Sequence, residues 1–183
     1  YQAKDVPALI KENFVSNIND YYGKIENELQ TIRYPDEPIK QIAKTWEDVA
    51  KSIYQEKTFG DEIKKTSYYQ NDLKRIIDTV SSKEERLNRI FSFVKNKMNW
   101  NGKYGYFSKD GVEKAYVEET GNVADINFIL VSMLKLAGID ANPVLISTRE
   151  NGVALFPNRS KFNSVIVAVK IEGKTFLLYA TNK

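Results

Sequence analysis

The sequence predicts an α+β domain in which helices come first and an antiparallel sheet comes last. Apolar residues recur at three- and four-residue steps over residues 124–137, which indicates a largely buried helix. Two alternating, β-branched runs at residues 164–171 and 175–180 flank Glu172-Gly173-Lys174, which is typical of a tight β-hairpin. We therefore expect a central helix packed against an antiparallel sheet.

The central helix has clear sequence signals at both ends. Residues 120–122 (Thr-Gly-Asn) are turn formers, and Gly138 stands where a helix C-terminus favours a residue with positive φ. Pro143 then begins an apolar run through Thr148, which predicts a strand. The helix face expected to be buried consists of Ile126, Ile129, Leu130, Met133, Leu134 and Ala137.

The N-terminal third has weaker patterns. Residues 21–34 alternate in part and end at Pro35, which predicts an edge strand. Thr45 is a suitable N-cap for a helix that runs to about Glu56. The residues expected to be buried on that helix are Trp46, Val49, Ala50 and Ile53.

Further helices are predicted in the middle of the chain. Residues 61–80 predict one or two short helices, and Ser82 with Glu85 forms a capping box for a longer one. The apolar stripe of that longer helix is Leu87, Ile90, Phe91, Val94 and Met98. Residues 99–111 form an aromatic loop interrupted by glycines, and a short helical stretch follows near residues 113–118.

Length and composition exclude several classes of protein. A chain of 183 residues suits one domain, or one domain and a piece of another, and its net charge of +3 is too small to indicate nucleic-acid binding. No apolar run approaches the roughly 18 residues that predict a membrane span. Cysteine and histidine are both absent, so the chain has no disulfide, thiolate nucleophile, imidazole base or Cys/His metal site. No cofactor and no metal site is predicted.

Few motifs for other chemistry remain. Ser132 and Lys135 have the Ser-x-x-Lys spacing of penicillin-binding enzymes, but Ser132 falls inside a helix and the partner motifs are missing. Asp125 complements the dipole at the start of the central helix. Arg149, at a strand end, either binds an anion, caps a loop or pairs with Glu150.

Four sequence blocks occur in an order that resembles a known family. Gly-Asn-Val-Ala-Asp-Ile-Asn at 121–127 precedes Ala-Gly-Ile-Asp-Ala-Asn-Pro-Val-Leu-Ile-Ser-Thr-Arg at 137–149. Phe-Asn-Ser-Val-Ile at 162–166 and Leu-Leu-Tyr-Ala-Thr at 177–181 follow. This order resembles the core of bacterial transglutaminase-like proteins over roughly residues 45–183. The resemblance implies a papain-like fold and, in catalytic members, a Cys-His-Asp triad.

All three triad positions carry other residues in this chain. By the resemblance, the nucleophile position is Val123, the base position is Ser164 and the acid position is Tyr179. Valine cannot attack a carbonyl, serine is not a base at neutral pH, and tyrosine is a weak acid with a pKa of about 10. We therefore expect a cysteine-free pseudoenzyme that keeps the scaffold without the reaction.

The function expected from this comparison is binding in the cleft that the lost triad leaves. A peptide, a polysaccharide or a partner protein are the ligand classes considered. The alternatives are a hydrolase or transferase built on another site, or a structural spacer. The residues that are candidates for lining the cleft are Trp100, Tyr104, Asn122, Asp125, Arg149 and Asn163.

The resemblance also implies a domain organisation and a location. Residues 1–36 look like a strand and connector from the end of a preceding β-rich domain, and residues 37–183 form the transglutaminase-like domain, with a truncated C-terminus left open. That β-rich domain would be a partner within the same full-length chain. The family implies an extracytoplasmic location, periplasmic or secreted.

Overall fold

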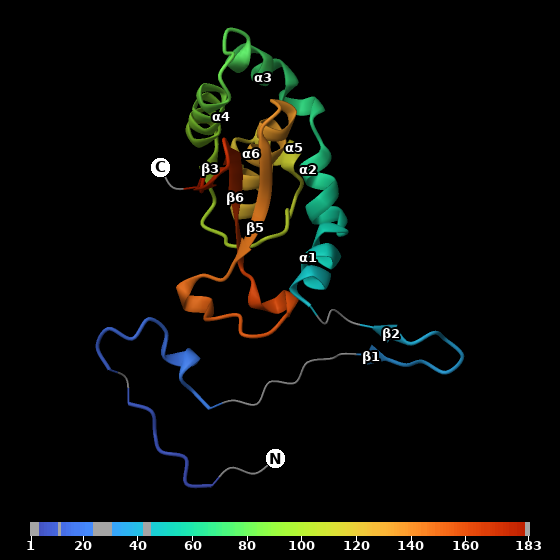
Figure 1. The fold of residues 1–183 in the computed structure, drawn as a ribbon, viewed down its shortest axis with the longest axis vertical. Coiled ribbons are helices and arrows are strands. Elements are labelled where there is room, and N and C mark those ends of the chain that lie inside the picture. Colours follow the sequence, from blue (N-terminus) through green and yellow to red (C-terminus); the bar gives the residue numbers. More distant parts are fainter. Residues whose placement is uncertain (1–3, 11, 24–30, 42–44, 182–183) are drawn as a thin grey trace.

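The computed structural model describes residues 4–10, 12–23, 31–41 and 45–181. Its core is helix α6 (Val123–Leu136), which packs against the strands β5 (Asp140–Ile146) and β6 (Ser164–Ile171). Helices α2, α4 and α5 contact α6 on its remaining sides, so that the helix is enclosed (Figure 1). The predicted α+β layout, with a central helix on an antiparallel sheet, is confirmed.

Helix α6 is buried along nearly its whole length, including every residue from Val123 to Leu134. Asn122 caps it through a reciprocal capping box with Asp125. At the other end, Gly138 has a φ of 77° and the Ile139 N–H donates to the Leu134 carbonyl at 3.0 Å, which is a Schellman ending. Both predicted helix ends are confirmed to within one residue.

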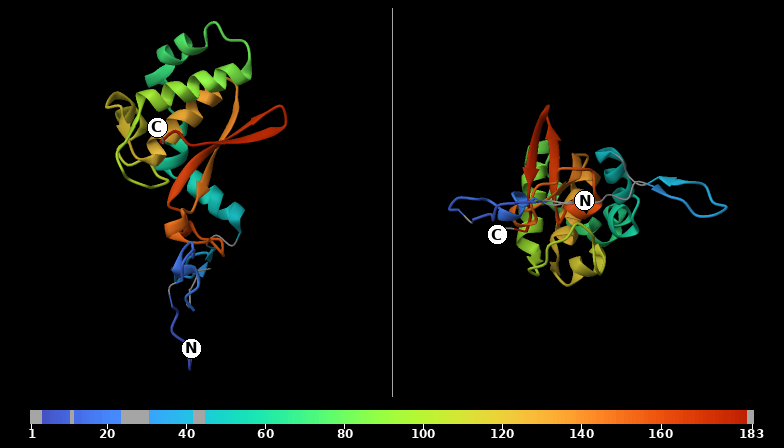
Figure 2. Two further views of the ribbon diagram at one scale, coloured as in Figure 1. Left: turned by 90° about the vertical axis from the view of Figure 1, so that its left-hand side faces the viewer. Right: turned by 90° about the horizontal axis from the view of Figure 1, so that it is seen from below.

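The sheet has three antiparallel strands in the order β5-β6-β7, where β7 spans Lys174–Leu178. Glu172 and Gly173 link β6 to β7 with φ values of 49° and 77°, the positive values that a tight hairpin turn needs. The β6–β7 hairpin extends well beyond the helices (Figure 2).

Strand β5 differs from its predicted bounds of 143–148. It begins three residues earlier, at Asp140, and contains Pro143 opposite Val167. Proline was expected to open the strand because it cannot donate a hydrogen bond to a neighbour. Since β5 is an edge strand, Pro143 can lie within it, with its missing N–H on the unpaired side.

The helices that precede α6 follow in sequence order. Their bounds are α1 Trp46–Tyr54, α2 Glu62–Lys64, α3 Gln70–Ile77, α4 Lys83–Lys97 and α5 Val112–Val117. Short single-turn helices occupy Lys57–Asp61 and Ser67–Tyr69. Among the described residues, none of these helices is long and apolar enough to cross a membrane.

Helix α1 has the predicted cap at Thr45, and Val49 and Ile53 are buried as expected. The prediction that Trp46 and Ala50 are buried is wrong, because Trp46 is 42% exposed and Ala50 is also exposed. Both residues face a surface groove between α1 and β5 rather than the core. Helical spacing identifies the apolar face of α1 but does not show how much of it a neighbour covers.

A short strand pair joins the region before α5 to the start of α6. Strand β3 (Asn99–Trp100) pairs in parallel with β4 (Thr120–Gly121). Gly121 is required here because a Cβ atom on it would lie only 2.7 Å from the Cβ of Asp125. The pair therefore fixes residues 99–111, the aromatic loop, next to the N-terminus of α6.

The N-terminal segment contains little regular structure. Residues 24–30 of the strand predicted over 21–34 lie outside the described residues, and Tyr21 and Tyr22 lie in a turn and a bend. The strand that is present is β1 (Thr31–Ile32), which pairs with β2 (Lys40–Gln41). A single-turn helix at Ile18–Asp20 lies beside the loop after β5, since Asp20 accepts a hydrogen bond from the Val153 N–H at 3.0 Å. The remaining short helices are Arg149–Asn151 and Arg159–Lys161.

Candidate binding cleft

The three residues expected at the triad positions lie at element ends. Val123 is the first residue of α6 and Ser164 the first residue of β6, and neither has any exposed surface. The Ser164 hydroxyl has no hydrogen-bond partner within the described part of the chain. Tyr179 directly follows β7 and is half-buried.

Hydrogen bonds connect the start of α6 to the end of β7. The Asn127 side chain donates to the Val123 carbonyl at 2.9 Å and accepts from the Ala180 N–H at 3.2 Å. Asn127 therefore links the nucleophile position to the residue after Tyr179. The side-chain proximity of Val123, Ser164 and Tyr179 stays a prediction.

The backbone at Val123 is also committed to structure. Its N–H donates to the Lys103 carbonyl at 3.2 Å. Acyl-transfer enzymes use N–H groups at such positions to stabilise the oxyanion of a tetrahedral intermediate. Here the Val123 N–H is already engaged by the Lys103 carbonyl of the aromatic loop.

A cavity of about 540 Å³ lies beside these positions, between the aromatic loop and the segment before β6. We call it the aromatic cleft. Its lining residues are Tyr104, Gly105, Tyr106, Phe107, Ser108, Lys109, Asn122, Phe162 and Asn163. Asn122 and Asn163 directly precede Val123 and Ser164, so the cleft borders two of the replaced triad positions.

Three of the six candidate cleft residues, Tyr104, Asn122 and Asn163, line this cavity. Both asparagine side chains are engaged within the protein. Asn122 Nδ2 donates to the Phe107 carbonyl at 3.0 Å, and Asn163 exchanges hydrogen bonds with the backbone and hydroxyl of Thr148. They hold the walls in place, whereas the Tyr104 side chain is 53% exposed.

The other three candidates are placed differently. Trp100 packs edge-on against Tyr104 with ring centroids 5.2 Å apart, so it supports the cleft wall from outside. Asp125 is buried beneath the cleft and accepts a hydrogen bond from Ser108 at 2.5 Å. Arg149 lines a separate cavity of about 400 Å³, together with Asp20 of the N-terminal segment.

Burial raises the pKa of Asp125 above its ordinary value, and the hydrogen bonds from Ser108 and from the Asn122 backbone partly oppose that effect. A raised carboxyl pKa beside a cleft is a feature of general acids and bases. In this chain, however, both Asp125 oxygens already accept hydrogen bonds from the protein. The geometry indicates a buried cap of α6.

The sequence did not single out the other six lining residues: Gly105, Tyr106, Phe107, Ser108, Lys109 and Phe162. The aromatic, glycine-interrupted composition of residues 99–111 was a signal that this loop forms a surface. Its direction over the N-terminus of α6 depends on the pairing of β3 with β4. Strands of two residues are too short to give a recognisable sequence pattern.

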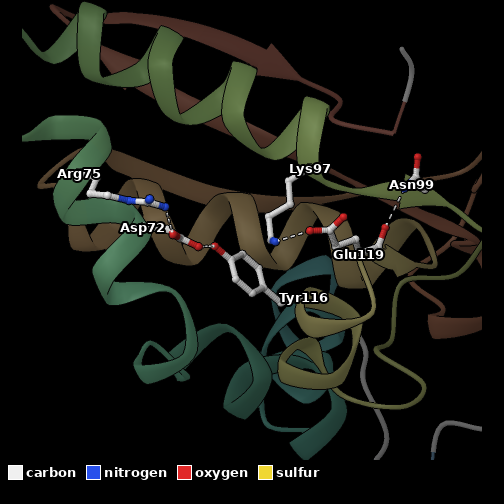
Figure 3. Close-up of polar contacts among 6 residues, drawn as sticks. All are labelled: Asp72, Arg75, Lys97, Asn99, Tyr116 and Glu119. Atoms are coloured by element: carbon white, nitrogen blue, oxygen red, sulfur yellow. Dashed lines mark hydrogen bonds and ion pairs between the residues drawn. The ribbon is translucent and has the colours of Figure 1, made fainter.

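A network of polar contacts lies near the β3–β4 pair that anchors the aromatic loop (Figure 3). The Tyr116 hydroxyl donates to Asp72 at 2.5 Å, and Arg75 forms an ion pair with the same carboxylate. Lys97 lies 4.6 Å from the Tyr116 ring centroid and pairs with Glu119 at 2.7 Å. The network joins α3, α4 and α5, and it holds the residue that precedes β4.

This network makes a testable contribution to stability. The hydrogen bond from Tyr116, helped by Arg75, holds the pKa of Asp72 below its usual value. We expect Tyr116→Phe to lower the free energy of unfolding by about 1.5–3 kcal/mol near neutral pH, the range for hydrogen bonds to charged groups. A depressed carboxyl pKa stabilises the fold above the unfolded-state pKa of about 4, and this stability is lost as the pH falls through the folded-state pKa.

The difference in free energy of unfolding between the parent protein and Tyr116→Phe should therefore shrink on acidification. Urea unfolding at about pH 7, 5 and 3 measures it. Tyr68→Phe is a matched control, because the neighbouring Tyr68 hydroxyl is buried without a hydrogen-bond partner in the described structure. A difference in free energy of unfolding between the parent and Tyr116→Phe that grows at low pH would contradict a hydrogen bond from Tyr116 to the ionised Asp72 carboxylate.

The fold is a papain-like α+β arrangement, and the chain has no cysteine or histidine from which a Cys-His-Asp triad could be built. The sequence model of the transglutaminase-like superfamily matches residues 71–179. This chain therefore belongs to the transglutaminase-like superfamily. Comparison with curated proteins gave no significant match.

The fold also matches a solved structure. A crystal structure of a "putative protease" from Parabacteroides distasonis superposes with a TM-score of 0.59 at 14% sequence identity. The match covers 85% of this chain and 31% of that one, so this chain corresponds to about a third of the length of that protein. At this level of identity the similarity shows the fold alone.

Proposed function

We propose that this protein is a non-catalytic, transglutaminase-like binding module that uses the aromatic cleft. The observation that carries the proposal is an open cavity in a transglutaminase-like chain that has neither cysteine nor histidine. Val123 has no exposed surface and no reactive group, while the adjacent cleft keeps a volume of about 540 Å³. A structural spacer would not need such a cavity, whose volume falls in the range of roughly 300–1,000 Å³ typical of ligand sites.

The composition of the cleft also supports binding over an alternative hydrolase. Glycosidases and related hydrolases need carboxyl groups that face the substrate. Among the described lining residues there is no Asp or Glu, and Lys109 is the one charged side chain. The Asp125 carboxyl group, which accepts a hydrogen bond from the lining residue Ser108, lies below the surface in the helix cap.

Tyr104 provides the test of this proposal. Labelled protein is applied to a display library of random linear peptides and to an array of bacterial polysaccharides. We expect a bound ligand whose Kd rises about tenfold in Tyr104→Ala, the loss typical of an aromatic contact residue. Tyr34→Ala is the matched control, because Tyr34 is also 53% exposed but does not line the aromatic cleft. Equal losses in the two variants, or no binder from either source, would refute a binding cleft.

The wider context is part of the same proposal. Residues 1–36 would end a preceding β-rich domain of the full-length chain, and the contact of Asp20 with the loop at Val153 would be where the two parts meet. The extracytoplasmic location in a bacterium, periplasmic or secreted, is proposed from the family resemblance. Nucleic acid is not among the proposed ligands.

A further inference from the structure

A second cavity, of about 220 Å³, lies between α1 and β5. We call it the apolar groove. Its lining residues are Trp46, Val49, Ala50, Ile53, Tyr54, Phe59, Pro143, Leu145 and Phe162, and none is charged. Trp46 and Tyr54 remain 42% and 39% exposed, so the groove leaves aromatic surface in contact with solvent.

The apolar groove and the aromatic cleft share a wall. Phe162 lines both cavities, and its ring packs edge-on against Trp46 with centroids 5.8 Å apart. The next residue, Asn163, lines the cleft and is fixed by Thr148. A ligand that crosses Phe162 would therefore contact both cavities at once.

The two cavities differ in chemistry. The groove is apolar, and its volume is below the roughly 300–1,000 Å³ of pockets that enclose whole small ligands, which suits a single large side chain. The cleft has Lys109 as the one charged group among its described lining residues. Its electrostatic complement is a carboxylate.

From this arrangement we infer that the ligand is an extended polypeptide segment with a large apolar side chain seated in the groove and an acidic residue beside Lys109. This inference rests on the proposed binding function of the cleft. A polysaccharide carries no side chain of that kind, so the groove favours a peptide among the three ligand classes. Affinity then comes mainly from burial of one side chain, and the carboxylate sets direction.

A selection experiment followed by a matched pair of variants tests this inference. Peptides are selected from the random linear display library on the purified chain. We expect the selected peptides to share a Phe, Leu, Ile, Met or Trp position with an Asp or Glu a few residues away. Ala50→Glu, which places a charge in the groove at an exposed helix position, should weaken binding of a selected peptide tenfold or more, as expected for loss of one buried apolar side chain.

Lys51→Gln is the control. It lies on the same exposed helix, lines neither cavity and changes the net charge by the same amount as Ala50→Glu. Its binding should stay within about twofold of the parent, since it removes no contact. Circular dichroism and urea unfolding of both variants separate a loss of binding from a loss of fold.

The outcomes separate this inference from the proposed function. Peptides or polysaccharides whose binding is weakened by Tyr104→Ala but not by Ala50→Glu would support the binding cleft. They would contradict the inference that an apolar side chain occupies the groove. Sedimentation showing a dimer that Ala50→Glu dissociates would assign the groove to a second copy of this chain instead. Absence of any ligand dependent on Tyr104 would overturn both proposals.

Discussion

The purified protein will neither hydrolyse peptides nor transfer acyl groups from glutamine-containing substrates above the uncatalysed rate. Removal of a complete triad from a serine protease costs about 10⁶-fold in kcat, and the surviving oxyanion hole and substrate binding leave only about 10³–10⁴-fold over water. The Val123 N–H, at the expected nucleophile position, is in addition already bonded to the Lys103 carbonyl. Amine incorporation, ammonia release and peptide cleavage are the three measurements.

A paired variant decides the origin of any activity that is found. Tyr179→Phe combined with Ser164→Ala removes both remaining hydroxyl groups of the replaced triad. Activity above background that this double variant abolishes would show that the site still works. Activity that survives it would belong to another site of the chain and would favour the alternative hydrolase or transferase function.

The second large effect concerns a thiol placed at the nucleophile position. Because the chain has no cysteine, Val123→Cys creates a protein with a single thiol. Val123 has no exposed surface, so we expect this thiol to react with an aromatic disulfide reagent about 10³-fold more slowly than an exposed one, through local opening only. Stopped-flow and manual absorbance measurements of thiol release cover both rates.

Ser81→Cys is the reference protein, since Ser81 is exposed in the connection before α4. The two single-thiol proteins should react at similar rates in strong urea, where both are unfolded. A Val123→Cys thiol that reacts as fast as the reference under native conditions would show that the nucleophile position is open to the cleft.

The sequence predicts those parts of the fold whose signals are local. The long apolar repeat of α6, its Gly138 ending and the Glu172-Gly173 hairpin all appear as expected, because each depends on neighbours within a few residues. The exposed Trp46 and the early start of β5 were missed. The exposure of Trp46 and the first residue of β5 both depend on neighbouring elements that are distant in sequence.

The candidate cleft was predicted in part for the same reason. The order of blocks identifies Asn122 and Asn163 because they directly precede two triad positions, and the structure places both at one cavity. Phe162 and Ser108 carry no signal of their own. Ser108 matters through a hydrogen bond to Asp125, 17 residues away, and Phe162 matters because it separates two cavities.

The hydrogen bond from Val123 to Lys103 also affects how the cleft can receive a ligand. Because the aromatic loop is already tied to the start of α6 and paired through β3 and β4, its backbone has little freedom left to lose on binding. A cleft of this kind is a preformed binding site. Its ligand alone bears the entropic cost of becoming ordered, so ligands that are stiff before they bind hold the advantage.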